Sequence, residues 1–226
     1  MVAIFVVVTI VAFLGIDFAY QRIQERKTAM AMEPNKLNKV NPISAISVPE
    51  GLFFHPGHSW AAITQDGWVK VGMDDFLNKL VGKIDGVEVK NLGGEVKQGD
   101  PLIVLRQGNR KAEIVAPVDG KVEMFNEKVA GDPQSIKDNP YNESWVCAVK
   151  PTNLIDNLKK LNIAETAKSW AREEVDRLAG FFTGANFENK LVGQTLQDGG
   201  APVEGVLTHM SDDAWDKFQN EFLNKA

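Results

Sequence analysis

The chain opens on an unbroken apolar run, residues 2–20, in which Asp17 is the only charged residue. A helix of this length rises about 28 Å, close to the hydrocarbon thickness of a bilayer. A cleavable signal peptide is the alternative, but no basic residue precedes the run and no small-residue cleavage site follows Leu14. The pattern therefore predicts an uncleaved transmembrane anchor, which with its basic flank covers residues 1–27.

The charges around this run predict its orientation. Lys and Arg residues are absent before it, and three follow it directly, at Arg22, Arg26 and Lys27. The positive-inside rule then places the rest of the chain in the cytoplasm, attached to the cytoplasmic membrane by a single span. Asp17 either reaches the headgroup region or pairs with a partner helix, because an unpaired carboxylate inside a bilayer is costly. Residues 28–47 have prolines and no regular period, which is typical of a linker.

Residues 48–151 alternate between apolar and polar positions in short runs broken by Gly, Pro and Asp. A hairpin is expected around Asp66-Gly67, because this dipeptide readily adopts the positive-φ geometry of a tight turn. A short helix is expected over residues 74–80. Further strands are expected at residues 82–84 with 87–89, 102–106 and 121–125. Many short strands with Gly-rich turns predict a mainly β domain with helices, in the form of a small barrel or sandwich.

Residues 152–226 change to a helical period and form a predicted C-terminal extension. Helices are expected at 153–161 and 164–182, and Ser211 is expected to cap a last helix. Their apolar stripes include Trp170 on one helix and Trp215, Phe218 and Phe222 on another. These stripes either wrap the β domain or bind a partner. We favour partner binding by these four aromatic residues, because exposed aromatic stripes are costly and the barrel core should be self-sufficient.

Composition narrows the functional classes. The 226 residues carry a net charge of −5, which argues against a dedicated nucleic-acid binder. One cysteine, Cys147, cannot form an internal disulfide or a Cys-based zinc site. Three histidines leave little material for a multi-His metal centre. We therefore expect neither a bound metal nor a nucleic-acid partner.

Several motifs of the β domain occur in an order that belongs to one family. They are His58-Ser59-Trp60, Val71–Phe76, Gly94–Pro101, Ala116–Gly120, Asn126, Asp132-Pro133 and Asp138–Trp145. Together they resemble the glycine cleavage system H protein, whereas the Gly-Asp-Pro and Ala-Pro-x-x-Gly pieces alone would indicate only the wider lipoyl and biotinyl superfamily. The resemblance implies a flattened β-barrel of two sheets. It also implies a packing role for His58, beside Trp60.

The resemblance further implies a lysine at a hairpin tip, where H proteins carry a lipoyl group that moves between partner enzymes. Counted without gaps from Pro101 to Pro117, this position falls on Asn109, whose amide cannot be lipoylated. Lys111 could replace it only if the hairpin register slipped by two residues. We expect no cofactor, with lipoate on Lys111 as the alternative. Three cations surround the tip, at Arg106, Arg110 and Lys111. They are either solvated, or Arg106 and Arg110 bind a docking partner.

Other chemical candidates are weaker. His55 and His58 lack a carboxylate or cysteine at metal-binding spacing, and the Asp74-Asp75 pair stands where a helix begins, so that it is expected to cap this helix. Cys147 is expected to be a buried strand thiol. The sequence thus predicts a non-enzymatic, membrane-anchored accessory subunit of a larger membrane complex, plausibly a respiratory or electron-transfer assembly. A membrane-tethered lipoyl carrier, modified at Lys111 and acting in one-carbon or acyl transfer, is the alternative. An unmodified regulatory domain that binds H-protein partners is a third hypothesis.

Overall fold

The computed structural model describes residues 46–184 and 204–224. The predicted anchor over residues 2–20, its basic flank and nearly all of the linker lie outside the described residues. Within the two described ranges, no helix is long and apolar enough to cross a membrane.

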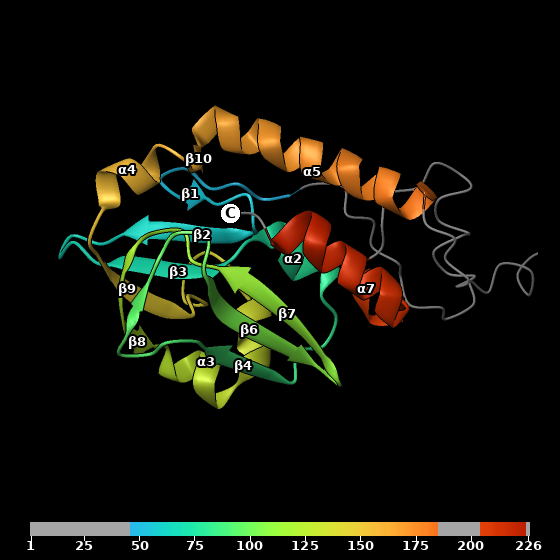
Figure 1. Cartoon of the computed structure of the whole chain (residues 1–226), viewed down its shortest axis with the longest axis horizontal. Coiled ribbons are helices and arrows are strands. Elements are labelled where there is room, and N and C mark those ends of the chain that lie inside the picture. Colours follow the sequence, from blue (N-terminus) through green and yellow to red (C-terminus); the bar gives the residue numbers. More distant parts are fainter. Residues whose placement is uncertain (1–45, 185–203, 225–226) are drawn as a thin grey trace, which may run out of the picture. The chain divides into compact units, whose positions relative to one another are not determined.

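In the described residues, ten strands form two antiparallel sheets (Figure 1). The seven-stranded sheet has the order β10-β1-β2-β3-β9-β8-β5, and the three-stranded sheet has the order β4-β6-β7. The strands are β1 (Phe53–Phe54), β2 (Ser59–Ile63), β3 (Val69–Met73), β4 (Gly86–Val89), β5 (Glu95–Val96), β6 (Pro101–Gln107), β7 (Arg110–Val115), β8 (Gly120–Phe125), β9 (Cys147–Pro151) and β10 (Asn162–Ile163). The prediction of a mainly β domain with helices is confirmed.

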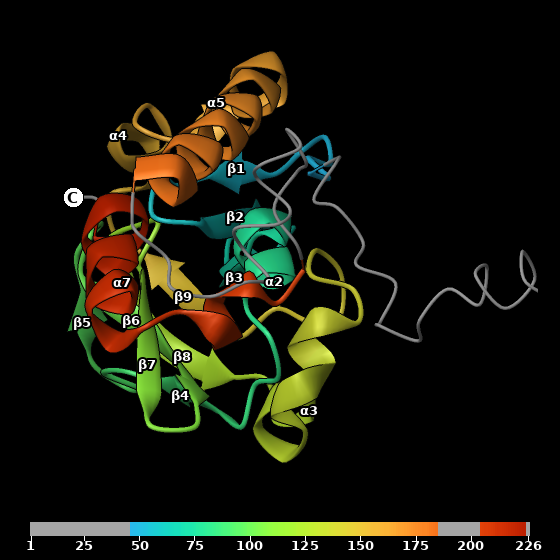
Figure 2. The ribbon, with the colours of Figure 1, turned by 90° about the vertical axis from the view of Figure 1, so that its right-hand side faces the viewer.

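Helices connect and cover these sheets. They are α2 (Asp75–Leu80), α3 (Glu127–Gly131), α4 (Leu154–Leu158), α5 (Ala164–Gly184) and α7 (Asp212–Phe218), with 3₁₀ turns at Pro133–Lys137 and Val206–His209 and a π turn at Gln219–Leu223. The long helix α5 lies over the side of the sheet that carries β1 and β10, and α7 lies beside the hairpin of β6 and β7, as both views show (Figures 1 and 2).

The predicted hairpin forms between β2 and β3. Its register pairs Ile63 with Val69, and the loop between them contains Gly67 at φ +79°. Helix α2 begins as predicted, because a carboxylate oxygen of Asp74 accepts a hydrogen bond of 2.9 Å from the Leu77 amide. Ser211 caps α7 in the same way, accepting from the Ala214 amide.

The strand predicted at residues 82–84 does not form, and β4 begins only at Gly86. The reason is that side chains satisfy this stretch of backbone. The Lys137 ammonium donates to the carbonyls of Val81 and Gly82, and the side chain of Gln134 accepts from the Ile84 amide at 2.9 Å. Burial, opposed in part by Glu204, lowers the pKa of Lys137.

The motif Ala116–Gly120 leads into β8, where the backbone of Gly120 lies very close to the backbone of β9. A Cβ on Gly120 would lie 2.3 Å from the carbonyl oxygen of Lys150, so no side chain fits there. Gly120 lies opposite Pro151 in the pairing of β8 with β9. The glycine of this motif is thus a requirement of sheet packing.

The hydrophobic core does not stop at the end of the β domain. One contiguous cluster runs from the strands into α5 and into residues 204–224, which we call the C-terminal segment. Strand β10 also pairs with β1, which joins residues 162–163 to the large sheet. The described residues beyond Pro151 are therefore built into the same folded unit as the strands.

The C-terminal segment corrects the prediction that its aromatic stripe binds a partner. Trp215 is 3% exposed, and Phe218 and Phe222 are fully buried in the common core. Phe218 and Phe222 stack on each other at 4.9 Å between ring centroids, and Phe222 stacks on Phe76 of α2 at 6.0 Å. The expectation of a self-sufficient barrel core was wrong, because these rings complete that core.

Trp170 is also used within the chain. Its ring lies 6.4 Å from Phe54 and 5.2 Å from His58, and it packs on a second, smaller apolar cluster under α5. It is half-buried. The predicted apolar stripe of α5 is therefore the face that this helix packs against the strands.

Near the start of the described polypeptide, hydrogen bonds hold the backbone of Ser47 in place. The Ser47 amide donates to the carboxylate of Asp75 at 2.8 Å, and the Ser47 carbonyl accepts from the Tyr141 hydroxyl at 2.7 Å. The same hydroxyl accepts from the Asp75 amide at 2.8 Å. Burial is the main reason that the pKa of Tyr141 is raised, so the hydroxyl keeps its proton. Both backbone hydrogen-bonding groups of Ser47 are thus held by α2 and the loop before β9.

Candidate functional site

The hairpin of β6 and β7 ends in a two-residue turn. Gln107 pairs with Arg110, which leaves Gly108 and Asn109 as the hairpin tip. Gly108 has φ +58°, as the first central position of such a turn requires, and its amide donates to Asp85 at 2.8 Å. The side chain of Asn109 is exposed. The structure thus places at the tip the residue that gap-free counting placed there.

Lys111 lies on strand β7, two residues beyond the tip. It pairs with Arg106. The register of the two strands is regular from the pair of Ile103 with Ile114 to the pair of Gln107 with Arg110. The only register shift in this hairpin lies at its other end, between Pro101 and Ile103. An amine at Lys111 is therefore exposed, but it does not occupy the turn.

Arg110 is not a free surface cation. Its guanidinium donates to the carbonyls of Leu207 at 3.2 Å and Met210 at 2.5 Å, and to Asp212 at 3.0 Å. It also lies over the Trp215 ring, 5.6 Å from the centroid. Arg110, which was predicted to dock a partner, is thus engaged by contacts within the chain.

Two further contacts fix the C-terminal segment to the hairpin. The Trp215 indole donates to the backbone carbonyl of Lys111 at 3.1 Å, and the Gln107 amide donates to Thr208 at 3.1 Å. Arg106, the other predicted docking cation, forms an exposed ion pair with Glu88 on β4. Neither arginine of the tip therefore presents an uncompensated charge.

Replacing Arg110 with methionine is expected to reduce the free energy of unfolding by about 1–3 kcal/mol, because two backbone carbonyls lose their donor. Hydrogen exchange should show faster exchange in residues 206–212. Arg106→Met is the matched control, and its exposed ion pair should contribute less than about 1 kcal/mol. Equal effects of the two substitutions would contradict the assigned role of Arg110.

A polar cleft of about 450 Å³ opens beside the tip. It is lined by Lys83, Asp85, Gln107, Gly108, Asn109, Arg110, Thr208 and Asp212. The hydrogen bond from Gly108 and the neighbouring Lys83 lower the pKa of Asp85, so that both signs of charge meet in this cleft. None of its lining side chains is a cysteine or histidine, and its one lysine, Lys83, is 83% exposed and 3.4 Å from Asp85.

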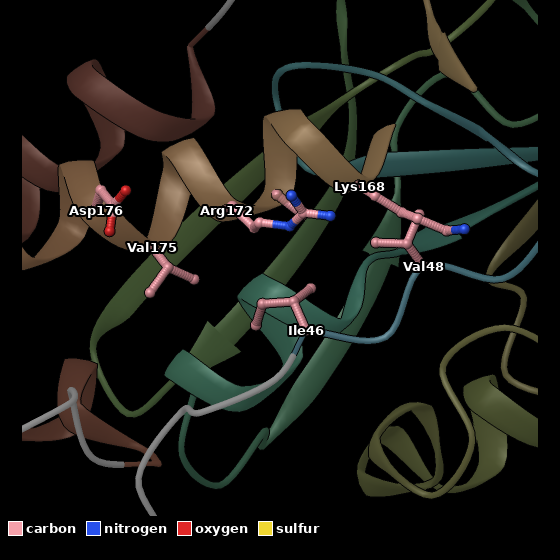
Figure 3. A pocket seen from close by; sticks show the side chains of 7 residues that line it. Ile46, Val48, Lys168, Arg172, Val175 and Asp176 are labelled. Atoms are coloured by element: carbon pink, nitrogen blue, oxygen red, sulfur yellow. The ribbon is translucent and has the colours of Figure 1, made fainter. Parts of the chain in front are cut away.

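A second cleft, of about 590 Å³, lies along α5 (Figure 3). Ile46 and Val48 border it on one side, and residues of α5 border it on the other. Lys168, Arg172 and Asp176 give this side a mixed charge, with Ala171 and Val175 between them. The cleft is lined by both apolar and charged side chains, and these lining residues form no catalytic arrangement.

A buried charged centre joins α5 to the strands. His58 is fully buried, and its Nδ1 lies 2.8 Å from Asp74, while its Nε2 lies 3.8 Å from Glu174 of α5. Glu174 also pairs with Arg177, which donates to the carbonyl of Glu221 at 2.9 Å. The resemblance had implied only a packing role for His58. Its position between two carboxylates is a correction to that expectation.

This environment sets the charge of His58. Burial alone lowers the pKa of an imidazole, but the charge and hydrogen bond of Asp74, together with the charge of Glu174, outweigh it and raise the pKa of His58 to about 9. His55 shows the opposite result, because burial and the positive charge of His58 lower its pKa to about 4. Near neutral pH, His58 is therefore charged and His55 is neutral.

The remaining sequence candidates have structural roles. Asp74 caps α2, and Asp75 is paired with Lys79 at 2.9 Å. Cys147 is fully buried on β9, and burial raises the pKa of its thiol. In the part of the chain that the structure describes, no group of three or more His, Cys, Asp or Glu side chains could hold a metal ion.

Comparison with known proteins identifies the family. A model of the family described as "Glycine cleavage H-protein" matches residues 52–174, which is more than half of the chain. The chain belongs to the glycine cleavage H-protein family. The matched range ends at Glu174, so it takes in α4, β10 and the first half of α5 as well as the strands.

Curated relatives agree with this assignment. A probable glycine cleavage system H protein of Pyrococcus abyssi is 37% identical over 54% of this chain and 91% of its own length. A glycine cleavage system H protein of Coprothermobacter proteolyticus is 33% identical over 57% of this chain and 100% of its own length. A solved structure of the H protein from Mycobacterium marinum is 24% identical, with a TM-score of 0.46, over 56% of this chain and 98% of that one.

The family match does not include the polypeptide after Glu174, and the described part of that polypeptide supplies Phe218 and Phe222 to the core. Sequence reasoning missed the Glu174 partner of His58, since these residues are far apart in the chain and follow no shared period.

Proposed function

We propose that this chain is a membrane-tethered, non-enzymatic member of the H-protein family, which supports a larger complex through protein contacts and does not carry lipoate. The observation that carries the proposal is Asn109 at the hairpin tip, in a turn of regular register. A lipoyl group is attached through a primary amine, and an amide side chain offers none. The apolar run of residues 2–20 supports the membrane tether.

The geometry around the tip also supports a role without a swinging arm. The C-terminal segment lies against the hairpin through Arg110, Gln107 and Trp215, so the tip is braced on one side. Lys111, the alternative attachment site, lies on strand β7, and its carbonyl is engaged by the Trp215 indole. The exposed faces of the strands and of α5 are the surfaces we propose for partner contacts among the described residues, since the C-terminal aromatic rings are buried.

The proposal predicts a defined mass and location. The full-length chain, produced in a host that lipoylates H proteins and supplied with lipoate, should be recovered from the membrane fraction in mild detergent. Its intact mass should equal that of the unmodified polypeptide. The Pyrococcus abyssi relative, produced in the same host, serves as the positive control for lipoylation.

Two variants sharpen this test. Asn109→Lys restores an amine at the tip, and Lys111→Arg removes the alternative one. A lipoyl adduct on the wild-type chain that disappears in Lys111→Arg would establish the carrier function and overturn the proposal. Recovery of the full-length chain in the soluble fraction would overturn the tether, and co-purification with glycine cleavage enzymes would favour a regulatory domain in place of a membrane subunit.

A further inference from the structure

The centre formed by His58, Asp74 and Glu174 joins helix α5 to the end of the β2–β3 hairpin, where the Asp74 amide donates to the His58 carbonyl at 3.1 Å. His58 lies in the loop between β1 and β2, Asp74 precedes α2, and Glu174 lies in the middle of α5. All three side chains are at least nine-tenths buried. A charge placed at such depth is costly unless it is paired, so these groups constrain one another strongly.

The imidazole is held in a fixed orientation. Phe76 stacks on it at 4.4 Å between ring centroids and an angle of 11°, and Trp170 lies 5.2 Å away. His58 also adopts φ +65°, a backbone conformation that is uncommon for residues other than glycine. In this orientation Nδ1 of the ring faces Asp74 and Nε2 faces Glu174.

The two contacts of the ring are unequal. Nδ1 lies at hydrogen-bond distance from Asp74, 2.8 Å, whereas Nε2 lies 3.8 Å from Glu174. A neutral imidazole keeps one N–H, and the shorter contact holds it on Nδ1. The proton that leaves is then the one on Nε2, and its loss turns a lone pair toward the carboxylate of Glu174. The link to α5 is the one that breaks.

We propose that protonated His58 is a clasp that docks α5 on the strands, and that loss of its Nε2 proton weakens this docking selectively. The clasp extends to the end of the chain, because Arg177 neutralises Glu174, donates to the carbonyl of Glu221 and lies 4.7 Å from the Phe222 ring centroid. Release of α5 therefore loosens the C-terminal segment as well. This inference is independent of the proposed membrane function.

Charged and titratable groups face His58 from several neighbouring elements. Asp74 and Asp75 belong to the start of α2, with Asp75 engaged by Lys79 and Ser47. Glu174 and Arg177 belong to α5, Tyr141 to the loop before β9, and His55 to the same loop as His58. Arg177 is the second cation at Glu174, and it pairs with the carboxylate oxygen that does not face His58.

The sign of the pH effect follows from linkage. The pKa of His58 is about 9 in the folded chain and 6.5 for a free imidazole, so the clasp is fully present below pH 6.5 and is lost as the pH rises through 9. Burial raises the pKa of Glu174, but His58 and Arg177 outweigh this and lower it, so Glu174 remains ionised throughout that window. A full return of the pKa of His58 to 6.5 would correspond to a change on the order of a hundredfold between pH 6.5 and 9.5, and opening of α5 should increase by less than this, because the pair of His58 with Asp74 persists when α5 is released.

The test measures hydrogen exchange of the full-length chain in detergent between pH 6.5 and 9.5, corrected for intrinsic exchange rates. Amides of α5 should lose protection over this pH range relative to amides of β2 and β3, by less than about a hundredfold because the pair of His58 with Asp74 persists when α5 opens. His58→Gln and Glu174→Gln should each remove this pH dependence. His55→Gln is the matched control in the same loop, and it should keep the pH dependence.

A direct measurement covers the case in which a variant fails to fold. The nitrogen chemical shifts of the His58 imidazole in the wild-type chain should report the charged form at pH 7.5. A neutral imidazole at that pH, or α5 amides that lose protection no faster than the strands, would overturn the proposal. Persistence of the pH dependence in folded His58→Gln would overturn it as well.

Discussion

Replacing Phe222 with alanine is expected to reduce the free energy of unfolding by about 3–5 kcal/mol, which is enough to unfold a large fraction of a marginally stable domain. The side chain is fully buried and contacts rings from three parts of the chain, Phe76, Phe181 and Phe218. Its removal leaves a cavity that these rigid aromatic neighbours cannot fill. Chemical denaturation of the full-length chain measures the effect.

The control for Phe222→Ala is Ile155→Ala, on α4. Ile155 is 75% exposed, so its truncation should change the free energy of unfolding by less than about 0.5 kcal/mol. If Phe222→Ala left stability unchanged and instead removed a partner, the ring would belong to an interface. That result would restore the partner-binding interpretation that burial in the structure contradicts.

Replacing Asp74 with alanine is expected to have an effect of similar size, about 3–5 kcal/mol, because it breaks a buried ion pair and removes a helix cap together. One carboxylate oxygen of Asp74 accepts from the Leu77 amide, and the other accepts from His58. The alanine variant leaves the His58 charge with only the longer contact to Glu174. Denaturation at pH 6.5, where His58 is fully charged in the folded chain, measures the loss.

Asp74→Asn separates the two roles of this residue. The asparagine oxygen can still cap α2, so the difference between the two variants should be about 1 kcal/mol, the usual contribution of a cap. The remainder belongs to the charge on His58. Equal stability of wild type and Asp74→Asn would contradict the assignment of a charged His58.

Local features of the fold could be predicted from the sequence because their causes are local. Asp66-Gly67 sets the turn between β2 and β3, and Asp74 caps α2 regardless of what lies elsewhere. Each of these two inferences needed only a few neighbouring residues. The position of the tip came from the family resemblance, which put the family's lysine position on Asn109 when counted from Pro101 to Pro117, and the structure has Asn109 in the turn.

Tertiary choices could not be predicted in the same way. The spacing of Trp215, Phe218 and Phe222 shows that one face of α7 and the following turn is apolar, but it does not say which surface covers that face. In the structure, the core of the same chain covers this face. The partnership of His58 with Glu174 depends on how α5 crosses the strands, which no period in the sequence encodes.

The attachment of Ser47 has a mechanical consequence. Tension along the chain from residues before Ile46 reaches the fold at Ser47, where Asp75 holds the amide and the Tyr141 hydroxyl holds the carbonyl. Because Tyr141 also accepts from the Asp75 amide, the load is shared between α2 and the loop that leads into β9, a strand between β3 and β8 in the large sheet. The short strand β1 is thereby shielded from being peeled off the sheet first.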